Sequence, residues 1–155
     1  MIIRKATPDD LSDILRMGAD FFAASGFSAV ADADTLSMIE TAEGLMKNDH
    51  AALLVADLDG ELVGMAGAVA YPFYFNREHL TGQELFWWVD PRHRTDGAGK
   101  ALMEGIEAWA RSLGMHSLMM VALPALDGDA VGKLYQRAGF KPAEHNYIRR
   151  LDYGH

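Results

Sequence analysis

Apolar residues recur along the chain at helical spacing in some stretches and in nearly unbroken runs in others. Thr7-Pro8 is typical of a helix start, Leu11 and Ile14 follow on one helical face, and Ser25-Gly26 ends the pattern. The same criteria predict further helices from residue 32 or 34 to about 48, from 97 to 113 and over 127–138. They predict strands over 2–6, 51–58, 61–71, 83–89, 117–123 and 144–151.

Turn residues suggest how these elements connect. Asp59-Gly60 between two apolar runs is the strongest short-range hairpin signal, and Pro72 is expected to end the second strand. Residues 73–79 are expected to form a loop rich in aromatic side chains. The predicted order is β-α-α-β-β-β-α-β-α-β in a single domain over residues 1–155. Crossover helices imply parallel pairing and the hairpin implies antiparallel pairing, so the fold class is α/β (α+β) with a mixed central sheet flanked by helices.

The stretch Trp87–Lys100 joins a strand to a helix through a short loop that contains glycine. The apolar run ends at Asp90-Pro91, and Gly97 and Gly99 open the helix. Backbone N–H groups at a helix N-terminus, aided by the helix dipole, attract anions, and glycine lets backbone approach a ligand closely. The stretch therefore predicts a site for a phosphate-bearing cofactor, with an ordinary strand-to-helix turn as the alternative.

Two common phosphate-binding loops do not fit these glycines. A P-loop requires G-x-x-x-x-G-K-[ST], but Arg94 stands at its first glycine and Ala101 at its metal-binding hydroxyl. A dinucleotide fingerprint requires G-x-G-x-x-G near the first strand. Here Leu102 replaces the third glycine, and the motif lies past the middle of the chain. Nucleoside triphosphates and dinucleotides are therefore not the expected ligands.

The remaining pattern is Arg94-x-x-Gly97-x-Gly99 behind a strand that ends Val89-Asp90-Pro91, with the segment LYQRAGF at Leu134–Phe140. Here the chain resembles the GNAT family of acyl-CoA-dependent N-acetyltransferases, whose pyrophosphate loop has the pattern R/Q-x-x-G-x-G/A. The resemblance covers essentially the whole chain, although the specific motifs lie within residues 83–140. It implies the GNAT fold and an enzyme that transfers an acetyl group from acetyl-CoA to a primary amine.

The resemblance also implies which residues bind acetyl-CoA. Backbone N–H groups of residues 97–100 would donate to the pyrophosphate, and Arg94 would add positive charge. The pantetheine arm would pair with Trp88-Val89 at the splayed end of the strand, and a backbone N–H near Val89 would stabilise the oxyanion. The expected cofactor-binding residues are Trp88, Val89, Arg94, Thr95, Asp96, Gly97, Ala98, Gly99, Lys100 and Tyr135.

Acetyl transfer needs one group to deprotonate the ammonium and another to protonate the leaving thiolate. Tyr135 stands at the family's tyrosine position and would protonate the thiolate; packing beside Phe140 is its alternative role. Glu84 lies where several family members place a general base; a surface carboxylate, with a water chain as base, is the alternative. Gly128 stands where the family often has asparagine, so no CoA contact from that side chain is expected. Because the chain has no cysteine to carry the acetyl group, we expect direct attack in a ternary complex.

Composition narrows the partners. The 155 residues include 14 basic and 22 acidic side chains, a net charge of −8, which disfavours nucleic acid and anionic membranes. No apolar run approaches the ~20 residues of a membrane span. The amino terminus lacks the apolar core of a signal peptide, so a cytoplasmic location is expected. Without cysteine, and without metal-ligand spacing at His50, His79 or His145, no metal is expected.

The identity of the acceptor is open at this stage. The acidic balance favours a cationic small-molecule or peptide amine, such as a polyamine, an aminoglycoside or a basic protein terminus. Tyr74 and Tyr147 are the expected acceptor contacts, and His93 is expected to be a solvated loop residue. A homodimer is one possible assembly of the chain. The alternative functions are a non-catalytic acyl-CoA-binding or regulatory module on the same fold, and an aromatic, methionine-containing surface that binds a protein partner.

Overall fold

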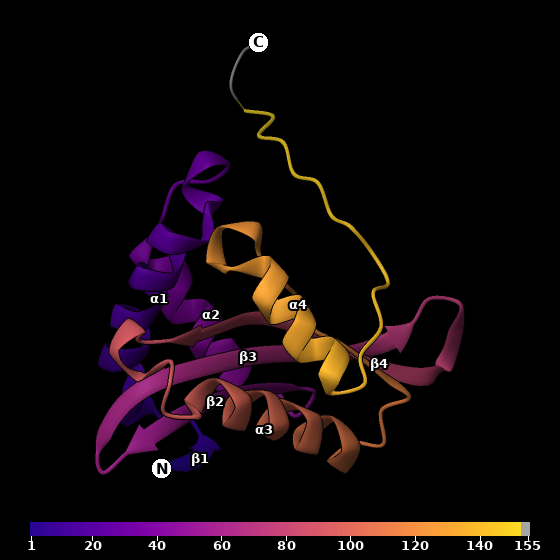
Figure 1. Cartoon of the computed structure of the whole chain (residues 1–155), viewed down its shortest axis with the longest axis horizontal. Coiled ribbons are helices and arrows are strands. Elements are labelled where there is room, and N and C mark those ends of the chain that lie inside the picture. Colours follow the sequence, from indigo (N-terminus) through magenta and orange to yellow (C-terminus); the bar gives the residue numbers. More distant parts are fainter. Residues whose placement is uncertain (153–155) are drawn as a thin grey trace. The chain divides into compact units, whose positions relative to one another are not determined.

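A computed structural model describes residues 1–152, and its central feature is a mixed sheet in the order β1-β2-β3-β4-β5 (Figure 1). The strands are β1 (Ile2–Lys5), β2 (Ala51–Leu58), β3 (Glu61–Phe73), β4 (Asn76–Val89) and β5 (Ser117–Met119). The first four strands pair antiparallel and β5 pairs parallel to β4. The mixed α/β sheet predicted from the sequence is therefore confirmed.

Within residues 1–152 the chain forms four α-helices: α1 (Leu11–Ser25), α2 (Thr35–Lys47), α3 (Ala98–Ser112) and α4 (Gly128–Arg137). Short 3₁₀ turns lie at Pro8–Asp10, Phe27–Ala29, Pro91–His93 and Pro124–Leu126. The chain divides into two compact units, one of residues 1–18 and 35–121 and the other of residues 19–34 and 122 onward. Each unit is described by itself. The prediction of a single domain over residues 1–155 stays a prediction.

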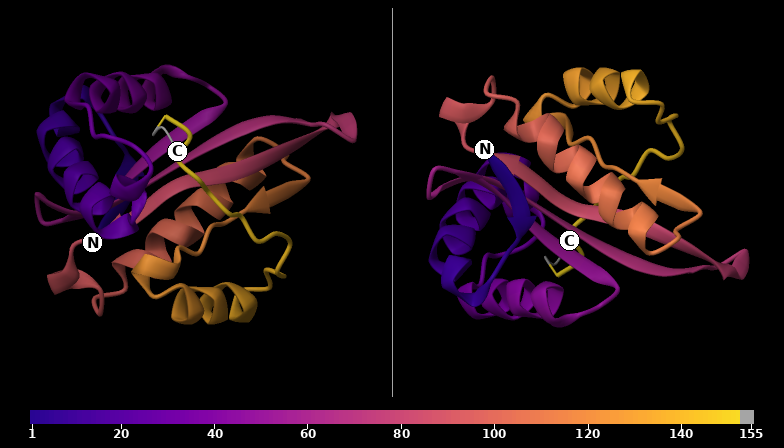
Figure 2. Two further views of the ribbon diagram at one scale, coloured as in Figure 1. Left: turned by 90° about the horizontal axis from the view of Figure 1, so that it is seen from above. Right: turned by 90° about the horizontal axis from the view of Figure 1, so that it is seen from below.

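The larger unit holds all five strands, with α2 on one face of the sheet and α3 on the other (Figure 2). The apolar stripe of α3 is buried because its residues recur at helical spacing. It packs on the apolar side chains of β2 and β3, and the cluster includes Leu54, Val63, Ala66, Leu102, Ile106 and Trp109. This core fixes α3 on the sheet, so the start of the helix is held close to the end of β4.

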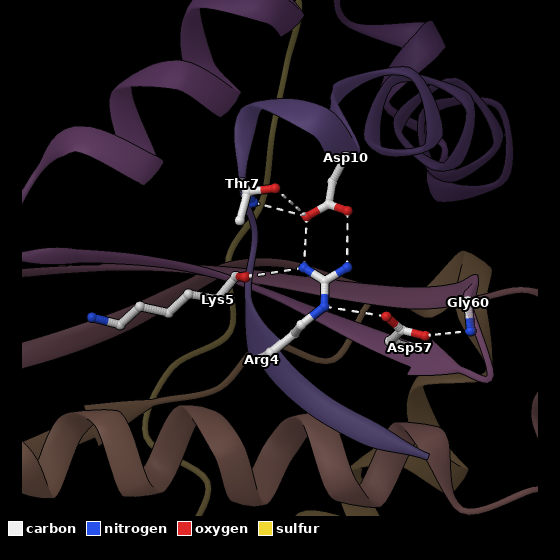
Figure 3. A network of polar contacts seen from close by, with 6 residues as sticks. All are labelled: Arg4, Lys5, Thr7, Asp10, Asp57 and Gly60. Carbon is white, nitrogen blue, oxygen red and sulfur yellow. Dashed lines mark hydrogen bonds and ion pairs between the residues drawn. The ribbon is translucent and has the colours of Figure 1, made fainter.

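An ionic network joins the first strand to its neighbours (Figure 3). The guanidinium of Arg4 on β1 donates two hydrogen bonds to Asp10, at 2.7 and 2.9 Å, and one to Asp57 on β2 at 3.2 Å. Asp10 in turn accepts the backbone N–H of Thr7 at 2.8 Å. The paired guanidinium lowers the pKa of Asp10 to about 2. The helix start predicted at Thr7-Pro8 is thus confirmed, and Asp10 fixes it to the sheet.

The hairpin predicted at Asp59-Gly60 is also confirmed, since both residues adopt positive φ angles, 53° and 93°, between β2 and β3. The prediction that Pro72 ends the next strand is wrong. β3 continues through Pro72 to Phe73. Residues 73–79, expected to be a loop, are instead the last residue of β3, the turn at 74–75 and the first part of β4. The register shifts between Pro72 and Phe73, and such an irregularity is where a strand tolerates a residue with no N–H to donate.

The carboxyl-terminal part of the prediction needs two corrections. The strand expected at 117–123 is only three residues long, and the strand expected over 144–151 is not formed: residues 141–152 carry no strand pairing. Tyr147, Ile148 and Leu151 are exposed, so this segment lacks the buried face that stabilises a strand. Arg150 instead binds Asp32, at 3.2 Å, and Asp152. No helix within residues 1–152 has the length and apolar character needed to cross a bilayer.

Candidate functional site

β4 separates from β5 next to an irregularity in its own backbone. In the described chain the parallel ladder between the two strands runs from Thr81↔Ser117 to Gln83↔Met119 and ends there. On the other side of β4, Glu84 pairs with Ala68 and Phe86 pairs with Gly67, so Leu85 is an extra residue. A bulge of this kind bends the strand that carries it. The second half of β4 therefore has an edge that β5 does not cover.

Glu84 lies at the point of separation. Its side chain is 3% exposed, and its carboxylate accepts a hydrogen bond from the backbone N–H of Val121 at 2.8 Å. Burial raises the pKa of Glu84 to about 7, and the hydrogen bond from Val121 opposes part of that rise. A carboxyl group with this pKa can take up and release a proton near neutral pH, which is the property needed in a general base.

The backbone at the end of β4 points one donor toward the open edge. The N–H of Asp90 donates to Val63 on β3 at 2.9 Å. Since successive N–H groups of a strand point to opposite sides, the N–H of Val89 points away from β3. The sequence had implied an oxyanion donor near Val89, and this orientation suits that role.

The loop after β4 leads into α3 through Gly97. Gly97 has a φ of 85° and is the N-cap of α3, whose first helical bond joins the N–H of Ala101 to the carbonyl of Gly97 at 3.0 Å. The first amides of a helix have no partner within the helix and point out of its N-terminus. Gly99 fits closely against the sheet: a Cβ there would lie 3.2 Å from the ring of Trp87. The two glycines thus leave the N-terminus of α3 with the geometry of an anion-binding site.

Several polar side chains of this loop already have partners. Arg94 donates from Nε to the carbonyl of Val89 at 3.0 Å, and its guanidinium lies 4.8 Å from the centre of the Trp88 ring. His93 lies in the turn after β4 and contacts Asp96 at 2.8 Å, and its side chain is 16% exposed, so it is partly solvated. Lys100 is exposed and lies 3.6 Å from Glu104.

A buried acidic residue supports the same strand end. Asp90 is 6% exposed and accepts the indole N–H of Trp88 at 3.1 Å. It also accepts two hydrogen bonds from Arg16 on α1, at 3.1 and 3.2 Å. The sequence indicated Asp90 only as the end of a strand. Nothing local could have revealed Arg16 as its partner, because the two residues are 74 positions apart.

The smaller unit contains the second motif. Tyr135 on α4 is buried and its ring lies 5.8 Å from that of Phe140. The packing that the sequence offered as an alternative is therefore present, and a role for the hydroxyl stays a prediction. Gly128 has a structural explanation: a Cβ at this position would lie 3.0 Å from the backbone oxygen of Leu123. The asparagine common in the family would therefore require the backbone at Leu123 to shift by a few tenths of an ångström.

The two expected acceptor contacts lie on different units. Tyr74 is at the tip of the β3–β4 hairpin and is 73% exposed, and its ring packs against Phe73 and Phe75. Tyr147 is in the segment after α4 and is 94% exposed. The structure brings Glu84, Trp88, Val89 and the loop to Lys100 together along β4 and the start of α3.

The uncovered edge of β4, the N-terminus of α3 and a buried carboxyl group with a pKa of about 7 are features that an acyltransferase using a phosphate-bearing thioester would need. Comparisons with known proteins agree. The profile of the Acetyltransferase (GNAT) family matches residues 19–140. Aminoglycoside N(6′)-acetyltransferase type 1 of Stenotrophomonas maltophilia is 30% identical over 118 residues, covering 75% of this chain and 71% of that protein.

Two solved structures share the fold. A predicted acetyltransferase with acetyl-CoA from Clostridium acetobutylicum superposes with a TM-score of 0.77 at 17% identity, covering 99% of both chains. Ribosomal-protein-alanine N-acetyltransferase from Brucella melitensis biovar Abortus 2308 has a TM-score of 0.73 at 23% identity, covering 97% of this chain and 100% of that one. The chain belongs to the GNAT family and is an acetyl-CoA-dependent N-acetyltransferase whose acceptor is an amine.

Proposed function

We propose that the chain acetylates a multiply charged small-molecule amine of the aminoglycoside type, with Glu84 as the general base. The observation that carries the catalytic part is the burial of Glu84 where β4 and β5 separate, together with its pKa of about 7. The ammonium of such an acceptor is a poor nucleophile until it loses a proton. Glu84 would accept that proton, directly or through one water.

The acetyl-CoA site in this proposal follows β4 into α3. Acetyl-CoA supplies the activated acetyl thioester. The N–H of Val89 would donate to the oxyanion, the amides at the start of α3 would hold the pyrophosphate, and Tyr135 would protonate the leaving thiolate. The residues proposed to bind the cofactor are Trp88, Val89, Thr95, Asp96, Gly97, Ala98, Gly99, Lys100 and Tyr135, and Arg94 lies beside them against Trp88 and Val89.

Two observations support a cationic acceptor. The relative from Stenotrophomonas maltophilia carries the name of an aminoglycoside N(6′)-acetyltransferase, and the net charge of this chain is −8. A negative protein raises the local concentration of a polycation. Tyr74 and Tyr147 are the proposed acceptor contacts. Homodimer formation and a cytoplasmic location remain predictions.

A panel of amines with acetyl-CoA, followed by release of free thiol, tests this function. The panel contains aminoglycosides with and without a free 6′-amine, a linear polyamine and a peptide with an amino-terminal alanine. We expect the highest kcat/KM with the aminoglycosides that have a free 6′-amine. Turnover with the peptide alone would indicate that the acceptor is a protein amino terminus. CoA binding without turnover on any amine would favour the non-catalytic module.

A further inference from the structure

A group of four side chains locks the end of β4, and all four lie in the larger unit. We call it the strand-end cluster, and it consists of Arg16, Trp88, Asp90 and Arg94. Its centre is the carboxylate of Asp90, which is 6% exposed and accepts hydrogen bonds from Arg16 and from the indole of Trp88. The second guanidinium nitrogen of Arg16 donates to the carbonyl of Leu62 at 3.1 Å. The cluster thus connects α1 to the last residues of β4.

Arg94 completes the cluster from the loop. Its guanidinium covers the face of Trp88 at 4.8 Å, while its Nε donates to the carbonyl of Val89 at 3.0 Å. A guanidinium over an indole gains cation–π attraction, and the hydrogen bond fixes its direction. Trp88 is therefore held at its edge by Asp90 and on its face by Arg94. The peptide after Val89 is held between them.

We propose that the strand-end cluster positions Val89 for acetyl-CoA, and that Arg94 acts through Trp88 and Val89 instead of binding the pyrophosphate. This rests on the proposed acetyl-CoA site. Arg94 and Asp90 are positioning residues in this assignment. The pantetheine arm is proposed to pair with the backbone at Trp88-Val89, so loss of the cluster loosens binding at the pantetheine end.

The position of the effect along the cofactor distinguishes the two roles of Arg94. Replacing a residue that binds the pyrophosphate would weaken the binding of CoA but not that of pantetheine, which has no pyrophosphate. A positioning residue affects both to the same degree, because both carry the arm that lies along β4. The affinities of CoA and of pantetheine, measured by calorimetry for each variant, therefore form the test.

Two variants test the proposal and two serve as matched controls. Asp90→Asn keeps the shape of the side chain but removes the charge that Arg16 needs, and Arg94→Met keeps the length but removes the guanidinium. Asp10→Asn breaks an ion pair of similar burial in the network of Figure 3, which contains none of the four residues of the strand-end cluster. Arg92→Met removes the same charge from an exposed position of the same loop.

We expect Asp90→Asn and Arg94→Met each to lower the affinities for CoA and for pantetheine by the same factor. That factor is about tenfold, as for the loss of one charge-assisted hydrogen bond. The double variant should lose little more than either single variant, because both act through Trp88. Both controls should bind as the parent chain does. An Arg94→Met variant that loses CoA affinity but not pantetheine affinity would overturn the proposal. So would equal affinities for Asp90→Asn and Asp10→Asn.

If Asp90→Asn does not fold, Arg16→Met tests the same pair from its half-exposed side, where the side chain is 44% exposed. Binding of CoA needs neither the acceptor nor Glu84. A parent chain that binds CoA but acetylates no amine therefore refutes the proposed function alone. A parent chain that binds neither CoA nor pantetheine refutes the acetyl-CoA site and the positioning role together.

Discussion

The carboxylate of Glu84 and the backbone N–H of Val121 are 2.8 Å apart, beyond the last pair that joins β4 to β5. Their hydrogen bond spans the two segments where strand pairing has ended. It satisfies one oxygen of a carboxyl group that is almost completely buried, but it brings no positive charge with it. The carboxyl group is therefore poised to exchange a proton near neutral pH, and the first two predictions follow from this pair.

Replacing Glu84 by Gln should reduce kcat by about 100-fold, the lower end of the usual contribution of a general base. In the parent chain kcat/KM should rise with pH to a plateau, with a midpoint near the pKa of about 7, because the ionised form of Glu84 accepts the proton. The variant should lack this limb. Glu78→Gln on the exposed part of β4 is the control and should keep it. A variant of Glu84 with an unchanged pH profile would remove this residue from catalysis.

The same variant should stabilise the fold at alkaline pH. The pKa of Glu84 is raised from 4.5 to about 7 on folding, so the folded chain binds the proton more tightly and its stability falls as the pH rises through this window. Above pH 7 burial of the charged carboxylate destabilises the folded state by roughly 3 kcal/mol, and a neutral Gln side chain avoids this loss. Urea unfolding at pH 8 should show Glu84→Gln to be the more stable, with the difference gone near pH 4. Equal stabilities at pH 8 would contradict the buried, ionised state.

CoA should protect the parent chain against thermal unfolding, and Gly97→Trp or Gly99→Trp should abolish that protection. A bulky side chain at either position covers the amides at the start of α3. Gly114→Trp is the matched control for Gly97, because Gly114 also has a positive φ, 68°, and follows the other end of α3. Gly97→Trp and Gly114→Trp both carry backbone strain of about 1–2 kcal/mol. Only Gly97→Trp should lose the increase in unfolding temperature that CoA causes. Unchanged CoA protection in Gly97→Trp would place the pyrophosphate elsewhere.

Tyr135→Phe should lower kcat by at least about tenfold while the affinity for CoA stays nearly the same. The phenol is the proposed proton donor to the thiolate, whereas the ring packing against Phe140 survives the substitution. Tyr71→Phe, which removes a phenol that donates to Gln83 at 3.2 Å, provides a control for loss of a hydroxyl. Steady-state rates and CoA binding measured on both variants separate the two effects. A Tyr135→Phe variant with parental turnover would leave Tyr135 a packing residue.

Elements governed by local chemistry could be predicted from the sequence. The turn at Asp59-Gly60 needs residues that accept positive φ, and the start of α1 needs the hydroxyl, proline and acid of residues 7–10. Gly97, the N-cap of α3, likewise occupies a position with a positive φ, which favours glycine. Each signal lies within a few residues of the structure that it specifies, so no knowledge of the rest of the fold is required.

The features that sequence reasoning missed depend on distant partners. Pro72 is accepted inside a strand because the ladder between β3 and β4 is irregular beside it, and the pairing of Arg16 with Asp90 joins residues 74 positions apart. The bulge at Leu85 has no signature, since any residue can occupy it. The predicted strand at 144–151 failed for the opposite reason: its composition suits a strand, but its side chains have no buried face.

The bulge also implies that the number of residues in β4 matters more than the identity of one of them. Leu85 is 41% exposed, and its neighbours Glu84 and Phe86 already pair with adjacent residues of β3. Removing Leu85 would leave a regular ladder with every other pair in register, but it would also remove the bend next to which β5 departs. We therefore expect substitutions at position 85 to preserve the sheet and the site, whereas a one-residue deletion should preserve the pairing of β3 with β4 but remove the bend at the site.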